Sequence, residues 1–360
     1  MLRRRRLQAP VNGSTLVTPL ERAGDAWDRL VATSMVRRGG NQLLVMDGPG
    51  ARAGVAAVWP LSQVLAAALD LEQAAPGRSA PARVDDLAGT VELYRRGDGY
   101  APYPASGERY YDDNAWLGLD FVQAHHQDHG PAAADSVWLH KAKRTFDLVA
   151  AGQDPDGGVR WVEGGGSRNT CSTAPAIALA LRLHRITGSE RFRAFAERSD
   201  EWLWATLARP DGLFADHVEA DGGVDDTAWA YNQGTPVGAD VLWFRVTGDH
   251  RRLARATRLA GDALDFYAVD DRLWGQPPAF VAVFFRNLLT LHAAEAQPRV
   301  VAELDRYLER VWHDGRDPGT GRFVAGGIGH YDDGGTLDHA ALVQLFALQA
   351  FDRSWLAEVS

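Results

Sequence analysis

The sequence predicts an all-α fold, an (α/α)6 barrel with six inner and six outer helices. Three observations lead to this prediction. Apolar residues recur at helical spacing, and no long stretch of strand-like alternation competes. The connections between the expected helices alternate between short and long. Apolar helices also alternate with amphipathic ones, as expected when every second helix lies inside a ring and the others face water.

The apolar spacing predicts twelve helices in order along the chain. They cover residues 20–35, 59–74, 85–96, 113–127, 134–151, 172–187, 189–207, 232–247, 249–267, 279–294, 298–312 and 337–353. Two of the joints are sharp, because Gly188 and Gly248 each stand directly before a capping residue.

Inner and outer helices differ in composition. Helices after long connections are apolar and rich in small residues, as in CSTAPAIALALRLHRITG at 171–188. Helices after short connections are charged on one side, as in PRVVAELDRYLERVW at 298–312. In an up-down array every second connection lies at the same end, so the long connections share the face at the N-terminal ends of the inner helices. We expect functional residues on that face.

Composition excludes several classes of function. The chain has 360 residues, 46% of them hydrophobic, and a net charge of -9, without a basic face for nucleic acid. No apolar run is long enough to span a bilayer. Cys171 is the only cysteine, so no internal disulfide forms. We expect it to be a buried small residue rather than a nucleophile.

The chain is expected to form one barrel domain over residues 19–360, preceded by a disordered basic tail at 1–18. The tail has no apolar run behind its four arginines, so it does not fit a secretory signal. We therefore expect a cytoplasmic protein, or a secreted one if a leader has been removed. The sequence does not fix the oligomeric state, although it is compatible with a monomer.

The stretch YYDDNAW at 110–116 places Asp112 and Asp113 side by side among aromatic residues. An Asp-Asp pair is most often a helix cap, and Asp85-Asp86 fits that role on the opposite face. Asp112 and Asp113 instead end a tyrosine-rich long loop. Retaining glycosidases need two carboxyl groups about 5–5.5 Å apart, framed by rings that stack on sugars. Adjacent residues of a regular helix do not face each other, so both side chains must turn toward one site.

Two further clusters enter neighbouring inner helices from the same face. They are WVEGGGSRNTCS at 161–172 and DDTAWAYNQG at 225–234. Together, their amide, hydroxyl and aromatic groups describe a polar carbohydrate cleft better than an apolar ligand pocket. The candidate sugar-binding residues are Tyr111, Asn114, Trp116, Trp161, Asn169, Ser172, Asp226, Tyr231, Asn232, Gln233, Tyr331 and Asp332.

These motifs resemble glycoside hydrolase family 76, the endo-α-1,6-mannanases. YDDNAW and YNQG, in this order and about 120 residues apart, carry the resemblance together with the segment around RNTCSTAPAI. It implies an (α/α)6 barrel acting with retention on α-mannan or α-mannosyl oligosaccharides, without a cofactor or metal. Asp112 would be the nucleophile and Asp113 the general acid/base. Leu117 stands where many members have a second Trp, which leaves the natural substrate open.

Different functions remain open on the same barrel. A sugar 2-epimerase would use histidines on the long-loop face, where His217, His330 and His339 are available. An unsaturated-uronide hydrolase or a non-catalytic carbohydrate-binding barrel would also fit this sequence. His125 and His129 lie one helical turn apart, but at the far end of their helix from the expected site, so we assign no metal to them.

Overall fold

The computed structural model describes residues 17–48, 54–77, 83–130, 133, 135–317, 319–323, 335–351 and 354. Residues 1–16 of the expected tail lie outside the described residues. So do the candidate site residues Tyr331 and Asp332, and His330.

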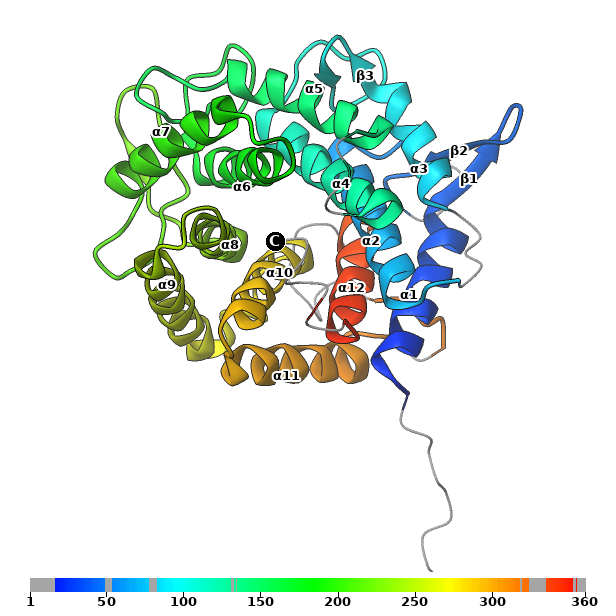
Figure 1. Cartoon of the computed structure of the whole chain (residues 1–360). Helices are drawn as coiled ribbons and strands as arrows, with labels where there is room; N and C mark the ends of the chain where they lie inside the picture. Colours follow the sequence, from blue (N-terminus) through cyan, green and yellow to red (C-terminus); the bar gives the residue numbers. More distant parts are fainter. Residues whose placement is uncertain are drawn as a thin grey trace, which may run out of the picture.

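Within these described ranges, twelve α-helices form two concentric rings (Figure 1). The inner helices are α2 (Val58–Ala74), α4 (Tyr111–His129), α6 (Thr170–Thr187), α8 (Ala230–Thr247), α10 (Pro278–Ala294) and α12 (Thr336–Gln349). The outer helices are α1 (Pro19–Ser34), α3 (Val84–Val91), α5 (Val137–Ala151), α7 (Glu190–Thr206), α9 (His250–Ala268) and α11 (Pro298–Asp314). Each inner helix packs against the next, and α12 closes the ring against α2. The prediction of an (α/α)6 barrel is confirmed.

Burial explains why the two rings differ in composition. The inner helix α12 is buried along residues 336–348, since it has neighbours on every side. The outer helix α11 buries a single stripe of Val300, Leu304, Leu308 and Val311, spaced three or four residues apart. Its charged residues lie on the opposite side, facing water. The alternation of apolar and amphipathic helices in the sequence therefore reflects whether each helix lies in the inner or the outer ring.

Short connections and close helix contacts depend on glycine at a few positions. Gly188 after α6 and Gly248 after α8 adopt left-handed φ values of 67° and 71°, which lets the chain turn directly into the next outer helix. Gly234 in α8 has a different role. A Cβ there would lie 2.6 Å from the Cα of Phe284 on α10, so only glycine allows this approach.

The sequence did not predict the short strands of the long connections. These are β1 (Met35–Arg38), β2 (Gln42–Val45), β3 (Arg95–Arg96), β4 (Gly99–Tyr100), β5 (Arg168–Asn169), β6 (His217–Val218) and β7 (Val224–Asp225). Strands of two to four residues are too short to show alternation. The sheet β5-β6-β7 places Asn169, His217 and Asp225 side by side.

Helix boundaries differ from the prediction in ways that matter for the site. The helices expected at 113, 172 and 232 begin two residues earlier, at Tyr111, Thr170 and Ala230. Asp113, expected as the first residue of the helix, and Asp112, expected just before it, therefore both belong to the first turn of α4. The helix expected over 85–96 is shorter: α3 stops at Val91, and the 3-10 helix η1 (Glu92–Tyr94) follows it. The helix cannot continue because Arg95 is extended and pairs with Tyr100.

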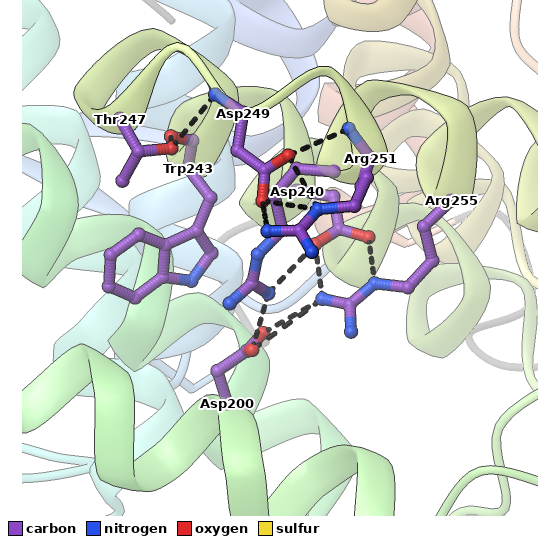
Figure 2. A network of polar contacts seen from close by, with 8 residues as sticks. Asp200, Asp240, Trp243, Thr247, Asp249, Arg251 and Arg255 are labelled. Atoms are coloured by element: carbon purple, nitrogen blue, oxygen red, sulfur yellow. Dashed lines mark hydrogen bonds and ion pairs between the residues drawn. The ribbon is translucent and has the colours of Figure 1, made fainter.

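An ion-pair network joins the inner helix α8 to the outer helices α7 and α9 (Figure 2). The Asp240 carboxylate of α8 is almost fully buried and accepts a 2.6 Å hydrogen bond from Nε of Arg255. Asp200 of α7 accepts a 2.5 Å hydrogen bond from Arg252. The guanidinium of Arg255 also lies 3.9 Å from the ring centroid of Trp204. Two buried acids thus meet two arginines, which fixes three helices together.

Replacing Asp240 with Ala should destabilise the protein by about 3 kcal/mol, because the partly buried Arg252 and Arg255 are then left to share the single carboxylate of Asp200. Urea unfolding measures this change. Arg251→Ala removes an exposed arginine next to the network and should leave the unfolding midpoint unchanged. Equal effects of the two substitutions would mean that the buried network does not hold these helices.

Candidate active site

A cavity of about 700 Å³ opens at the N-terminal ends of the inner helices. All six inner helices, or the long connections before them, contribute to it. Its described lining residues are Asp47, Ala57, Trp59, Pro60, Pro102, Tyr103, Tyr110, Asp112, Asp113, Trp116, Trp161, Ser167, Asn169, Cys171, Asp216, His217, Glu219, Tyr231, Phe280 and Leu337. The cavity therefore lies on the long-loop face, where functional residues are expected from the sequence.

Asp112 and Asp113 both line this cavity from the first turn of α4. The start of the helix is fixed from two sides. The N–H of Tyr111 donates to the carbonyl of Trp161 at 2.8 Å. The amide of Asn114 donates to the carbonyl of Tyr110 at 2.7 Å. Both carboxyl groups thus reach one open cavity, which was the condition set by the sequence.

The carboxylate of Asp112 is held through one of its oxygens. Its Oδ2 accepts a 3.0 Å hydrogen bond from the Trp161 indole, and the Cys171 thiol lies 3.7 Å from the same oxygen. Its Oδ1 is buried and has no hydrogen-bond partner in the described part of the chain. Burial raises the pKa of Asp112 to about 6, although these donors and the amides at the helix start oppose the rise.

The pKa of Asp113 is raised further than that of Asp112. Burial and the neighbouring charge of Asp112 raise its pKa well above the ordinary range of a carboxyl group. Of the two, Asp112 is therefore the carboxyl that ionises first as pH rises, and Asp113 is the one that keeps its proton to a higher pH. Two adjacent carboxyls divided in this way can act as nucleophile and acid at the same bond.

Aromatic rings form the walls beside the carboxyl pair. Trp116 lies one helical turn after Asp112, so it projects from the same side of α4. The ring of Trp161 is 41% exposed and meets Tyr110 edge to face at 5.0 Å. Across the cavity, Tyr231 stacks on Phe280 at 4.0 Å. Such rings offer flat faces to the apolar sides of a sugar.

A third acidic group enters the cavity from the connection before α8. Asp216 accepts a 2.8 Å hydrogen bond from Asn232, and its other oxygen lies 2.9 Å from Nδ1 of His217. Glu219 lies 3.2 Å from Nε2 of the same ring. Burial lowers the pKa of His217, but the two carboxylates outweigh it and give a net rise. Sequence reasoning missed Asp216 and Glu219, since single acids in a loop carry no motif.

Asp216, His217 and Asp225 lie close enough for one cation to contact all three. Both ring nitrogens of His217 already face carboxylates, however, and Asp225 accepts the N–H of Thr227. The group is thus internally hydrogen-bonded, and we assign no metal to it.

Four of the candidate sugar-binding residues line the cavity: Trp116, Trp161, Asn169 and Tyr231. Asn232 is buried and contacts the cavity only through Asp216. Ser172 is fully buried and does not belong to the lining. Asp226 is exposed and also lies outside the lining, and Asp216 is the acid of that connection that enters the cavity. The motif at 225–234 therefore does not include the acid of this connection that lines the cavity.

Three further candidates shape the site from behind. Tyr111 packs so closely on Gly152 that a Cβ there would lie 2.8 Å from its ring. Asn114 accepts the N–H of Tyr100 at 2.8 Å and donates to its carbonyl at 2.9 Å. Gln233 does the same with the N–H and carbonyl of Phe214, at 2.7 and 3.0 Å. Each amide clamps a long connection to the start of an inner helix, which explains its place in the motif.

A helical barrel with paired acids in an aromatic-lined cavity defines the class of carbohydrate-processing (α/α)6 proteins. The profile of glycosyl hydrolase family 76 matches residues 37–309. The chain belongs to glycosyl hydrolase family 76.

Relatives in sequence and in structure agree with this membership. The mannan endo-1,6-alpha-mannosidase DCW1 of Saccharomyces cerevisiae is 28% identical over 174 residues, which cover 43% of this chain and 38% of the relative. Its Candida albicans counterpart is 26% identical over 192 residues, covering 49% and 42%. The chain thus spans about two fifths of the length of these relatives.

Solved structures share the fold over nearly the whole chain. A family 76 glycoside hydrolase from a bovine Bacteroides thetaiotaomicron strain has a TM-score of 0.81 at 22% identity, covering 93% of this chain and 78% of that one. An inactive variant of the α-1,6-mannanase GH76A of Salegentibacter sp. HEL1_6, in complex with α-1,6-mannotriose, has a TM-score of 0.77 at 18% identity. It covers 92% and 99% of the two chains.

Asp112→Asn should stabilise the folded protein at pH 7. A carboxyl group whose pKa is raised by folding makes the folded protein less stable as it ionises. For Asp112 this loss develops as pH rises from 3.8, the pKa in the unfolded chain, through about 6, the pKa in the folded protein. The amide of Asn does not ionise, so Asp112→Asn should be more stable than wild type by on the order of 1–3 kcal/mol at pH 7, and this difference should vanish near pH 4. Urea unfolding at both pH values measures it, with exposed Asp85→Asn as the matched control. A loss of stability that is equal at both pH values would contradict the burial of an ionised Asp112.

Proposed function

We propose that this chain is a retaining glycoside hydrolase that cleaves α-1,6-mannosidic linkages within mannan. Asp112 is the nucleophile and Asp113 the general acid/base. The observation that carries the proposal is the placement of both carboxyl groups in one aromatic-lined cavity, with Asp113 favoured in the protonated form. The relatives named as mannan endo-1,6-alpha-mannosidases support the substrate. In the Salegentibacter enzyme the inactive variant replaces two consecutive aspartates, the same arrangement as here.

The reaction uses Asp113 in its protonated form and Asp112 in its ionised form. Asp113 gives its proton to the glycosidic oxygen while Asp112 attacks the anomeric carbon. The bond to the leaving sugar breaks, and a glycosyl ester forms on Asp112. Asp113, now ionised, takes a proton from water, whose oxygen displaces the ester at the anomeric carbon. The product keeps the α configuration, and both carboxyl groups return to their starting states.

The charge of the cavity favours a neutral sugar chain. Five described lining residues are acids, namely Asp47, Asp112, Asp113, Asp216 and Glu219, and no Lys or Arg stands among the described lining. An anionic uronide would meet repulsion there without a partner for its carboxylate. This charge distribution favours mannan over a uronide substrate.

An epimerase has less support from the described residues. Of the histidines considered for it, His217 lines the cavity, but both of its nitrogens face acids. His339 is buried, lies outside the lining, and has its pKa lowered by burial to about 4. A barrel that only binds sugar would have no need to keep two neighbouring carboxyl groups in its cavity, where each raises the cost of ionising the other.

Wild-type protein should hydrolyse linear α-1,6-mannan oligosaccharides, with α-anomers appearing first in NMR spectra. Asp112→Asn and Asp113→Asn should each lower kcat/KM by at least about 10³-fold, since each removes a group that acts in the transition state. Asp85→Asn, the same change in the Asp-Asp pair of outer helix α3, should leave activity intact. First appearance of β-anomers would contradict retention, and no turnover by folded wild type would contradict the substrate.

The pH profile of kcat/KM should be bell-shaped. Activity falls as pH drops through about 6, because Asp112 becomes protonated, and falls again at higher pH as Asp113 loses its proton. An aryl α-1,6-mannobioside with a good leaving group needs no acid to cleave the first bond. With it, Asp113→Ala should keep the acidic limb and lose the alkaline limb. An alkaline limb that persists in this variant would mean that another group is the acid.

A further inference from the structure

We propose that Cys171 is a positioning residue for Asp112, whose protonated thiol donates a hydrogen bond to Oδ2 and holds the carboxylate for attack. The kinetic part of this inference rests on the proposed function, whereas the contact itself does not.

The contact joins two elements at the base of the cavity. Cys171 is the second residue of α6 and is 5% exposed. Its Sγ lies 3.7 Å from Asp112 Oδ2, the oxygen that also accepts the Trp161 indole at 3.0 Å. A donor from α6 and a donor from the connection before it thus converge on one oxygen. Oδ1 is buried and has no hydrogen-bond partner among the described residues, so the indole and the thiol are the side chains that hold this carboxylate.

The thiol is a donor because its surroundings keep it protonated. Burial, together with the charges of Asp112 and Asp216, raises the pKa of Cys171 well above its ordinary value. A thiolate beside ionised Asp112 would place two negative charges in contact. The hydroxyl of Tyr231 on α8 is hydrogen-bonded to the thiol in turn. The thiol therefore lies in a chain of hydrogen bonds that runs from α8 to Asp112.

The groups facing Asp112 explain why a weak donor matters. Asp113 on α4, Tyr231 on α8 and Tyr110 before α4 are its titratable neighbours besides the thiol. Each of them is neutral or negative. With no Lys or Arg in the described lining, the ionised nucleophile depends on dipolar donors, namely the indole, the thiol and the amides at the helix start. Removing one donor should raise the pKa of Asp112 and loosen its orientation.

The infrared S–H stretching band tests the contact without any substrate. Cys171 is the only cysteine, so the band belongs to it, and Cys171→Ser provides the blank. In wild type the band should shift as Asp112 titrates near pH 6, because an ionised acceptor strengthens the hydrogen bond. In Asp112→Asn the shift should be absent. A band that does not respond to pH, or responds equally in Asp112→Asn, would overturn the proposal.

Kinetics then test the positioning role. Cys171→Ala should lower kcat/KM about tenfold, mainly through kcat, and move the acidic limb of the pH profile upward by about half a unit or more. Cys171→Ser keeps a donor and should stay within about threefold of wild type, with the limb unmoved. Ile177→Val removes one methyl group from the buried part of the same helix and should leave both unchanged. Melting temperatures verify that each variant is folded.

The two proposals fail in distinguishable ways. An unshifted acidic limb in folded Cys171→Ala, with wild-type kcat, would overturn the positioning role and leave the mannanase proposal standing. Failure of wild type to hydrolyse mannan would remove the proposed function. The infrared titration would still decide whether the thiol is hydrogen-bonded to Asp112.

Discussion

The burial of two adjacent carboxyl groups at the start of α4 is the constraint on which the site depends. Burial disfavours the ionised form of each carboxyl group, and the charge of Asp112 disfavours ionisation of Asp113 further, so Asp113 keeps its proton to a higher pH than Asp112. Asp112 then needs donors to stay ionised, and Asp113 needs only its proton. The dipoles of Trp161, Cys171 and the first helical turn supply the donors. The site is therefore less stable than an apolar one would be, and its reactivity comes from the same cause.

Precise placement of the pair comes from residues that never touch the cavity. Asn114 and Gln233 each bind the N–H and the carbonyl of one residue in an extended connection, and an amide is the side chain that can do both. The same device thus fixes the starts of α4 and α8, on two sides of the cavity. Because these amides are buried and satisfied, losing one would shift a whole connection rather than a single contact.

Periodicity was enough to predict the barrel, because ring position decides which helices are apolar and which are amphipathic. Of the candidate site residues, the carboxyl pair, Trp116, Trp161, Asn169 and Tyr231 line the cavity. The candidates that lie outside the lining follow from helix geometry. Successive residues of a helix differ in direction by about 100°, so a motif at a helix start points partly inward, as Tyr111 and Asn114 do. Asp216 was missed because it is a single acid in a long connection, just before the two-residue strand β6, and neither feature leaves a pattern in the sequence.

The protein uses aspartate in two opposite ways, and the placement of arginine decides between them. Asp200 and Asp240 are buried against Arg252 and Arg255, and the resulting network joins helices. The connections around the cavity also carry arginines, yet Arg109 pairs with Glu163, Arg160 with Asp154, and Arg168 with Asp156. Each of these three cations is thus paired with an acid outside the lining. An arginine beside Asp112 would lower its pKa and weaken it as a nucleophile, and one beside Asp113 would remove the proton that the reaction needs. Keeping cations out of the lining is therefore as much a part of the site as the two carboxyl groups.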